Sequence, residues 1–226
     1  RGVETSRITR LHQILGSDKL FSVEDHQSIQ MDAYSLRGAG DIPAFQGWAS
    51  ESPDVERARA LIADWDGVLT RESTAGAIYV EWTRLADSRA QDDATPSAER
   101  RTLIEEALEQ TVAALTEDWG ADWAGWQYGR SNPSALPHMF IPNFDLPAVE
   151  RPGGFGTINA TGANFRRIID LSDLDNSVAT NAPGQSAQPG SPFYGNLTDY
   201  LGNGEYFPFL FTREAVEKVV AHRLTL

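Results

Sequence analysis

The stretch that decides the fold class is residues 157–181, which read TINATGANFRRIIDLSDLDNSVATN. Three of its segments, 157–161, 165–171 and 177–181, are short runs with β-branched or aromatic residues, separated by Gly, Asn and Asp. Short runs of this kind between turn-forming residues are typical of β-strands. The stretch therefore predicts three short strands, with a further extended segment at 207–211.

The sequence before this stretch has the pattern of helices. The apolar stripes at helical spacing are Ile8, Leu11, Ile14, Leu15; Ile29, Ala33, Leu36; Val55, Ala58, Leu61, Ile62, Trp65; Ile78, Trp82, Leu85; and Leu103, Ala107, Thr111, Leu115. Helix starts are predicted at Ser22, Ser52-Pro53 and Thr95-Pro96, with two more at Ser191-Pro192 and Thr212. Helices come first and strands follow, so the predicted fold class is α+β.

Prolines are concentrated where the helical pattern gives way to the strand pattern. Five prolines lie within residues 133–152, which predicts a loop in place of a helix. We therefore expect a mainly helical segment over residues 1–130, a Pro-rich wrapping loop over 131–156 and a β-rich segment over 157–226.

The composition excludes several classes of protein. The 226 residues are 41% hydrophobic and carry a formal net charge of −13, with two Lys among 19 basic residues. This charge repels phosphate backbones, so we expect no nucleic-acid partner. No apolar run approaches the length of a membrane span, and the chain has no Cys, which excludes disulfides, thiolate metal sites and a Cys nucleophile.

Local motifs give weak signals of chemistry. His12, His26, His138 and His222 are widely spaced, so we interpret them as structural or surface residues and expect no metal site. Residues 184–188, GQSAQ, half resemble a nucleophile elbow, but two prolines follow where its helix would begin. We interpret this segment as a turn, Gly153–Gly156 as the entry to a strand, and Asp173–Asn176 as a turn. Most of the six Trp are expected in the core.

A set of landmarks, in order along nearly the whole chain, carries more information than any single motif. They are Arg7–Leu15, Ser22–Asp25, Ile29–Asp32, Leu61–Gly67, Ala77–Trp82, Trp123–Gly129, Gly153–Asn159, Phe165–Leu171, Ala182–Ser186 and Gly204–Thr212. Together they resemble the C-terminal portion of the β chain of the penicillin acylase family. Residues Ala187 and Phe193 depart from that pattern, which bears on the subfamily and substrate.

The resemblance implies an N-terminal-nucleophile hydrolase built as an αββα sandwich. Such acylases are cut from a precursor into an α and a β chain, and the first residue of the β chain, usually Ser, is the nucleophile. The family cleaves acyl amides of small molecules, of the β-lactam side-chain or N-acyl homoserine lactone type. The implied localisation is periplasmic or secreted.

The resemblance also assigns the residues of the active site to different segments. Position 1 of this sequence is Arg, so we expect the nucleophile and the oxyanion Asn on companion chains, namely the α chain and the N-terminal part of the β chain. A bound calcium, where present, would also be held there, and this chain itself implies no cofactor. One functional residue carries over: the active-site Arg falls on Arg7, where it would orient the base or the Asn. Arg1 and Arg10 are alternative registers, and a surface ion pair is the alternative role.

Two hypotheses therefore stand at this point. In the first, the chain is part of an amidohydrolase that acts only in a multi-chain assembly, with Trp48 or the region 29–34 as candidates for lining the acyl pocket. In the second, an acidic helical segment with six Trp is a non-catalytic ligand-binding or structural module.

Overall fold

The structure, a computed structural model, describes residues 5–93 and 97–221. The chain divides into two compact units. Unit 1 comprises Arg1–Gln13, Ala33–Pro133 and Glu150–Thr161; unit 2 comprises Ile14–Asp32, Ser134–Val149 and Gly162–Leu226. Within the described ranges, no helix is both long and apolar enough to cross a membrane.

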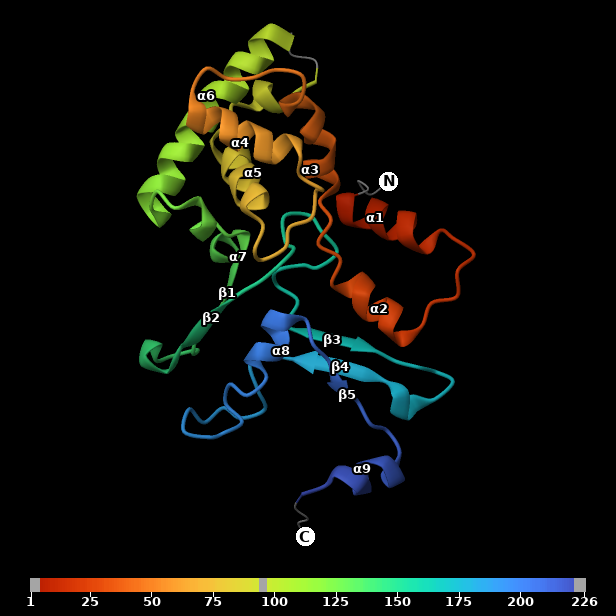
Figure 1. The fold of residues 1–226 in the computed structure, drawn as a ribbon. Helices are drawn as coiled ribbons and strands as arrows, with labels where there is room; N and C mark the ends of the chain where they lie inside the picture. Colours follow the sequence, from red (N-terminus) through yellow and green to blue (C-terminus); the bar gives the residue numbers. More distant parts are fainter. Residues whose placement is uncertain (1–4, 94–96, 222–226) are drawn as a thin grey trace. The chain divides into compact units, whose positions relative to one another are not determined.

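Unit 1 is helical (Figure 1). Its α-helices are α1 (Ser6–Leu15, whose last two residues fall in unit 2), α3 (Leu36–Asp41), α4 (Pro53–Ala63), α5 (Thr74–Leu85), α6 (Ser97–Trp119) and α7 (Tyr128–Ser131). Short 3-10 turns connect them: η1 (Ile42–Phe45), η2 (Ser88–Gln91) and η3 (Trp123–Gly125). The helical pattern predicted for this part of the sequence is confirmed.

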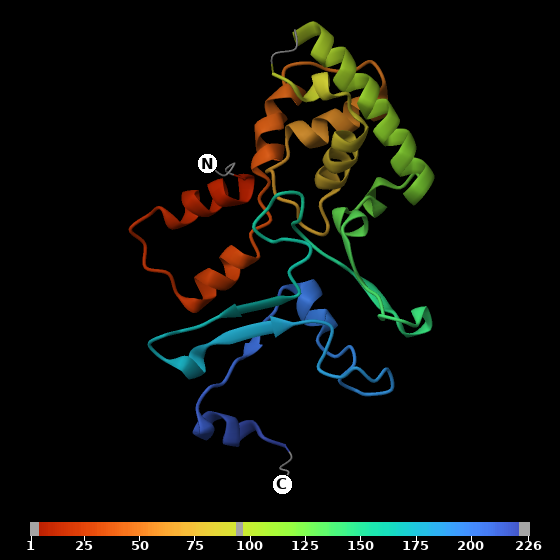
Figure 2. The same cartoon turned by 180° about the vertical axis from the view of Figure 1, so that it is seen from behind.

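The core of unit 1 lies where α4, α5 and α6 pack side by side, as both views show (Figure 2). Most residues of the predicted stripes are buried there: Val55, Ala58, Ile62 and Trp65 on and after α4, Ile78 and Trp82 on α5, and Ala107, Thr111 and Leu115 on α6. The predicted Leu61, Leu85 and Leu103 are only partly buried, and Ala77, Tyr79, Ile104 and Leu108 are buried in addition. Four of the six Trp are buried, and Trp82 packs edge-on against Phe45 with ring centroids 4.9 Å apart. The prediction that most Trp are core residues is confirmed.

The helix boundaries of unit 1 follow local signals, with one exception. Pro53 begins α4, and α6 ends at Gly120, whose φ of +88° few other residues adopt. The predicted start of α6 at Thr95-Pro96 lies outside the described residues. The predicted helix through Ile29, Ala33 and Leu36 is wrong, because the Ser35 hydroxyl caps a separate helix, α3.

Unit 2 combines short helices with two small sheets. Its elements are α2 (Val23–Gln30), β1 (Pro133–Leu136, whose first residue falls in unit 1), η4 (Pro142–Phe144), β2 (Leu146–Glu150, whose last residue falls in unit 1), β3 (Phe165–Ile168), η5 (Leu174–Asn176), β4 (Val178–Asn181), α8 (Thr198–Asn203), β5 (Phe207–Pro208) and α9 (Arg213–Val219). Strands β1 and β2 pair with each other, and both lie in the Pro-rich segment. Strands β3, β4 and β5 form an antiparallel sheet. The α+β class is confirmed.

The register of the three-stranded sheet assigns its side chains to two faces. Arg166 pairs with Thr180 and Ile168 with Val178 on one face, while Phe165 pairs with Asn181 on the other. Helix α2 packs near β3, and the Gln30 amide donates to the carbonyl of Arg167 at 3.2 Å. Burial lowers the pKa of Arg166, because its guanidinium is largely withdrawn from water.

Both lysines of the chain lie in unit 2, each beside a carboxylate. Lys19 Nζ is 2.7 Å from Asp25 Oδ1, and Lys218 Nζ is 3.0 Å from Glu214 Oε1. Asp25 also closes the capping box that begins α2, since its backbone N–H donates to Ser22 Oγ and its carboxylate accepts from the Ser22 N–H. The predicted helix start at Ser22 is therefore confirmed.

The last part of unit 2 holds one confirmed prediction and one correction. Thr212 caps α9 as predicted, its hydroxyl accepting from the Ala215 N–H. The predicted helix from Ser191 to about residue 201 is wrong over its first half, since α8 begins only at Thr198. The carbonyl of Phe193 accepts from the N–H groups of Gln185 and Ser186, so it does not take part in a helical turn.

Candidate functional site

Arg7, the residue that the resemblance places in the active site, lies on the first turn of α1. Its Nε donates to the carbonyl of Thr157 at 2.8 Å, and the neighbouring Ser6 hydroxyl donates to the carbonyl of Gly156 at 3.0 Å. Among the described residues, Arg7 forms no ion pair with a carboxylate. The guanidinium is thus held against a backbone loop of unit 1.

The loop that holds Arg7 is a compact turn. Gly153, Gly154 and Gly156 all have φ between +76° and +86°, and Phe155 between them has φ of +41°. The Gly154 N–H donates to the Asn159 carbonyl at 2.7 Å, and the Thr157 N–H donates back to the Gly154 carbonyl at 2.8 Å. The predicted strand at 157–161 and the strand entry at 153–156 are therefore wrong, because these backbone groups bond within the turn and not across a ladder.

Tyr128 on α7 and Asn132, the residue directly after α7, hold this turn by hydrogen bonds. Asn132 Nδ2 donates to the carbonyls of Arg151 (3.0 Å) and Gly153 (3.1 Å), while its Oδ1 accepts from the Thr161 hydroxyl at 3.1 Å. The Tyr128 hydroxyl donates to the Gly153 carbonyl, and burial raises the pKa of this phenol. Tyr128 therefore stays a neutral donor, and Asn132 is satisfied at both ends of its amide.

A buried Arg and a buried Asn complete the support. Arg151 is fully buried, and its Nη1 donates to the Thr161 carbonyl at 2.6 Å. Its Nη2 lies 3.3 Å from Asn159 Oδ1, and Asn159 Nδ2 donates to the Pro152 carbonyl at 3.2 Å. Asn159 begins an Asn-X-Thr sequence but is fully buried, so its side chain has a structural role.

Aromatic residues pack against the tip of the turn. The Phe155 ring meets Tyr79 edge-on at 6.2 Å between centroids, and the Arg37 guanidinium carbon lies 5.4 Å from the Phe155 centroid. The Tyr79 hydroxyl donates to Asp41 at 2.6 Å, and burial and then Asp41 raise the pKa of Tyr79. The turn is thus held by aromatic contacts at Phe155 as well as by hydrogen bonds to its backbone.

Arg7 stays a prediction from the family resemblance, and the residues that hold the Thr157 turn against it were not predicted. Arg151, Asn132 and Asn159 carry no periodicity, and their contacts span up to 29 positions along the chain. The one signal in the sequence was the glycine run at 153–156, since several glycines in a row require a special backbone conformation. Of the two alternative registers, Arg10 stacks on the Tyr34 ring at 4.6 Å, and Arg1 lies outside the described residues.

The other motifs are structural in the described residues. The segment at 184–188 is a turn after the cis Ala182-Pro183 bond with no helix following directly, so the turn interpretation is confirmed. Asp175 accepts from the Thr212 N–H and hydroxyl, which lowers its pKa and joins a turn to α9. No group of three His, Asp or Glu in the described ranges is arranged to hold a metal ion, and His222 lies outside them.

The comparison with known families assigns the class of protein. The penicillin amidase family model matches residues 3–218, nearly the whole chain, and the chain belongs to this family. Membership implies an amide hydrolase. No curated protein matches the chain.

Proposed function

We propose that the chain is part of an amidohydrolase that cleaves the acyl amide bond of a small molecule, of the β-lactam side-chain or N-acyl homoserine lactone type. The observation that supports the proposal is the family match together with Arg7, which we assign to the active site and whose Nε is fixed on the Thr157 carbonyl at 2.8 Å. A turn held by Asn132, Arg151 and Tyr128 keeps that carbonyl in place.

Companion chains of the same precursor would supply the nucleophile, its α-amino base and the oxyanion Asn. In such a reaction the hydroxyl attacks the amide carbonyl, and the Asn side chain and a backbone N–H stabilise the tetrahedral oxyanion. A guanidinium has five donors, so with Nε on Thr157 the Nη groups are the donors that we assign to the Asn or to the base. Arg7 is in this proposal a positioning residue.

The assembly and the place of action follow from the same proposal. Residues 1–130 would form a helical shoulder, residues 131–156 would wrap, and residues 157–226 would complete an αββα sandwich with the companion chains. A calcium ion, where present, would be held by the companion chains. The expected localisation is periplasmic or secreted.

The decisive experiment measures hydrolysis of a chromogenic acyl amide by the complete protein and its variants. Arg7→Gln is expected to lower kcat by about 10²–10³ with a smaller change in KM, because oxyanion stabilisation acts in the transition state. Arg7→Lys should recover little of this, since an ammonium lacks the planar fork. If Arg7 acts on the α-amino base, its removal should raise the pKa of that base, and the acidic limb of the profile of kcat against pH should move to higher pH in Arg7→Gln. If the acidic limb stays where it is in the wild type, Arg7 acts on the oxyanion Asn.

The matched control is Arg10→Gln, one turn further along α1. Arg10→Gln should retain wild-type kcat, and equal losses in both variants, or unchanged kcat in Arg7→Gln, would contradict the assignment of Arg7. An intact-mass spectrum of the protein from its native source tests the companion chains. A co-purifying chain that begins with Ser, Thr or Cys supports the proposal, whereas a single 24.8 kDa species would favour the binding or structural module.

A further inference from the structure

An open pocket of about 400 Å³ lies in unit 1, between the loop after η1 and the beginning of α6. This volume is within the range of about 300–1,000 Å³ typical of small-molecule sites. Its walls include Pro43, Ala44, Trp48, Arg100, Arg101 and Ile104. None of these residues belongs to the contacts that hold Arg7, so the pocket is separate from the candidate active-site residue.

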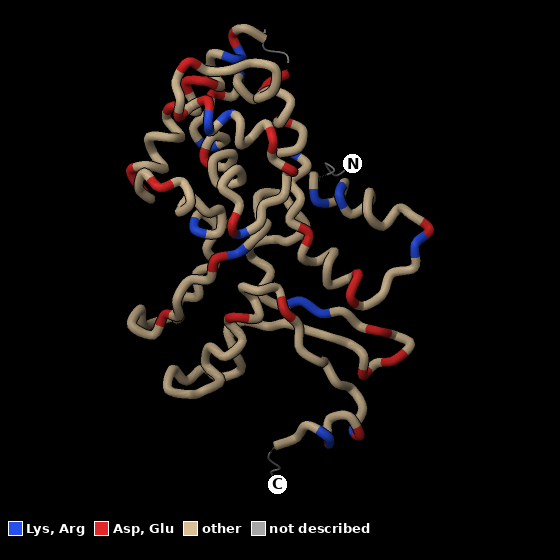
Figure 3. Tube along the Cα trace, in the orientation of Figure 1, with Lys and Arg blue, Asp and Glu red and all other residues tan. Residues whose placement is uncertain are grey.

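The charge of this pocket is opposite to that of the chain. Acidic residues outnumber basic ones, 32 to 19, and occur in both units, and the net charge is −13 (Figure 3). The charged residues among the described lining are Arg100 and Arg101, and Asp93, which is not part of the lining, pairs with Arg100. A concave site lined by one sign of charge concentrates ligands of the opposite sign, so the pocket selects anions.

The two arginines have different roles. Arg100 is fixed: its Nε donates to the Ala90 carbonyl at 3.0 Å, and its Nη1 lies 2.5 Å from Asp93. Arg101 donates one Nη2 hydrogen bond to the Ala49 carbonyl at 3.1 Å and forms no ion pair with a described carboxylate. Arg101 is therefore the donor available to an anion, whereas the charge of Arg100 is balanced by Asp93.

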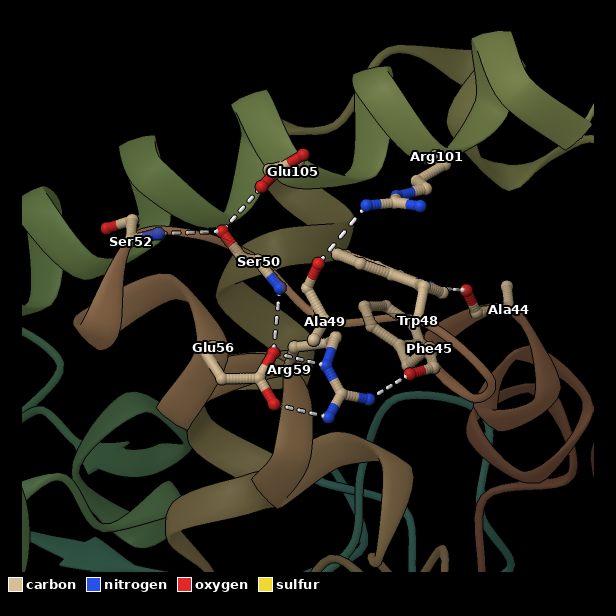
Figure 4. A network of polar contacts seen from close by, with 10 residues as sticks. All are labelled: Ala44, Phe45, Trp48, Ala49, Ser50, Ser52, Glu56, Arg59, Arg101 and Glu105. Atoms are coloured by element: carbon tan, nitrogen blue, oxygen red, sulfur yellow. Dashed lines mark hydrogen bonds and ion pairs between the residues drawn. The ribbon is translucent and has the colours of Figure 1, made fainter.

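Trp48 forms the aromatic wall. Its indole N–H donates to the Ala44 carbonyl at 2.9 Å, so the polar atom of the ring is satisfied. The guanidinium carbons of Arg101 and Arg59 lie 5.1 and 5.5 Å from the ring centroid, reaching it from α6 and α4 (Figure 4). The ring thus lies against two guanidinium groups, one of which is that of Arg101.

The loop that carries Trp48 is held rigidly. Ser50 N–H donates to Glu56 at 2.9 Å, and the Ser50 hydroxyl lies 2.5 Å from Glu105 (Figure 4). Arg59 binds Glu56 through two N–H groups and donates to the Phe45 carbonyl. A site that is already ordered binds its ligand without the cost of ordering the loop.

We infer that this pocket binds a small organic carboxylate with a flat apolar body. The carboxylate accepts from the Arg101 guanidinium, a geometry that suits its planar fork. The apolar body lies beside Trp48 and against Ala44 and Ile104, which line the pocket. The inference uses the pocket alone and stands independently of the proposed amide hydrolysis.

The test is a calorimetric titration of the complete protein with sodium benzoate. Benzoate is expected to bind at one site per chain. Neutral benzamide, of the same shape, should bind at least about tenfold more weakly, because a hydrogen bond to a charged group is worth about that factor. Acetate and inorganic phosphate, which lack the flat apolar body, should also bind more weakly than benzoate.

Single substitutions test whether benzoate binds at this pocket or at another arginine that stacks on a tryptophan. Arg101→Gln should raise the dissociation constant for benzoate by about tenfold. Trp48→Leu should reduce the ratio of the affinity for benzoate to that for acetate. The matched control is Arg130→Gln, since the Arg130 guanidinium carbon lies 4.9 Å from the Trp119 centroid outside this pocket. It should leave the affinity unchanged.

Several outcomes would overturn the inference. They are no heat of binding with benzoate, equal binding of benzamide, equal binding of phosphate, or equal loss in Arg101→Gln and Arg130→Gln. Because Arg101 is exposed, its substitution is not expected to unfold the protein, and a thermal melt of each variant verifies this.

Discussion

The two units of this chain differ in how much apolar surface they bury. In unit 1, 18 buried residues form one core cluster built on α4, α5 and α6. In the described part of unit 2 the buried hydrophobic residues are Leu136, Ile168, Ala179 and Leu201. Unit 1 thus has a core of its own, while unit 2 has the sheet and turns without a comparable interior.

The two units also differ in how many large apolar side chains they expose to solvent. Nearly all of them belong to unit 2, and they are Leu15, Leu20, Met139, Phe140, Ile141, Phe144, Phe165, Leu171, Leu174, Phe193, Phe211, Val216, Val219 and Val220; unit 1 contributes Ile8 and Phe155. Surfaces this apolar commonly mark contacts with other proteins. The difference agrees with the proposal that companion chains cover unit 2.

The largest effect is expected in the core of unit 1. Trp82→Ala removes a fully buried ring and should lower the free energy of unfolding by about 3–5 kcal/mol. Chemical denaturation measures the change. The control is Trp82→Phe: the Trp82 indole N–H is buried without a hydrogen-bond partner in the described structure, so Phe removes only this donor and some volume and should cost less. Equal losses would contradict this account of the core.

A smaller loss is expected in the turn that holds Arg7. A Cβ at Gly153, where φ is +78°, would lie 2.6 Å from the Asn159 carbonyl oxygen. Gly153→Ala should therefore lower the free energy of unfolding by roughly 1–3 kcal/mol. Gly162→Ala is the control, since a Cβ there meets nothing within 4 Å. If denaturation curves show the two variants equally stable, the turn is not constrained as described.

A still smaller effect, dependent on pH, is expected at the ion pair beside Trp48. Hydrogen bonds from Arg59 and from the Ser50 N–H lower the pKa of Glu56 from 4.5 to about 2. A lowered pKa stabilises the folded protein above pH 4.5, and this stabilisation disappears as the pH falls towards 2. Glu56→Gln should therefore be less stable than the wild type at pH 7, with a difference that declines between these values in thermal melts. A difference that stays constant down to pH 2 would exclude this origin.

The smallest change in stability is expected in unit 2. Phe140 is 80% exposed, so Phe140→Ser should leave the free energy of unfolding within about 0.5 kcal/mol of the wild type. Denaturation measures this value, and light scattering should show less self-association, because one apolar side chain has been removed from the surface. A loss comparable to that of Trp82→Ala would mean that Phe140 is part of a core.

The parts of the fold that the sequence predicts correctly are those with local signals. The capping box of Ser22 and Asp25, the Gly120 end of α6 and the stripe on α5 each involve residues within a few turns of one another. The stretch at 165–181 likewise forms strands β3 and β4 as predicted. The family resemblance used the order of such landmarks along the chain.

The parts that the sequence does not predict depend on distant contacts. Arg7 and Thr157 are 150 positions apart, and no pattern in either segment indicates their hydrogen bond. The segment at 157–161 has the composition of a strand, but the glycines before it close the backbone into a turn. The pocket beside Trp48 brings together residues about 50 positions apart, joined by the Arg101 hydrogen bond to Ala49.

The positions of the two lysines have a practical consequence for chemical attachment. Lys19 and Lys218 both lie in unit 2, each beside a carboxylate and with more than half of its side chain exposed. Reagents that couple to lysine side chains would therefore link this chain to a support or a dye through unit 2. The helical unit, with Arg7 and the pocket at Trp48, has no lysine side chain at which such coupling could occur.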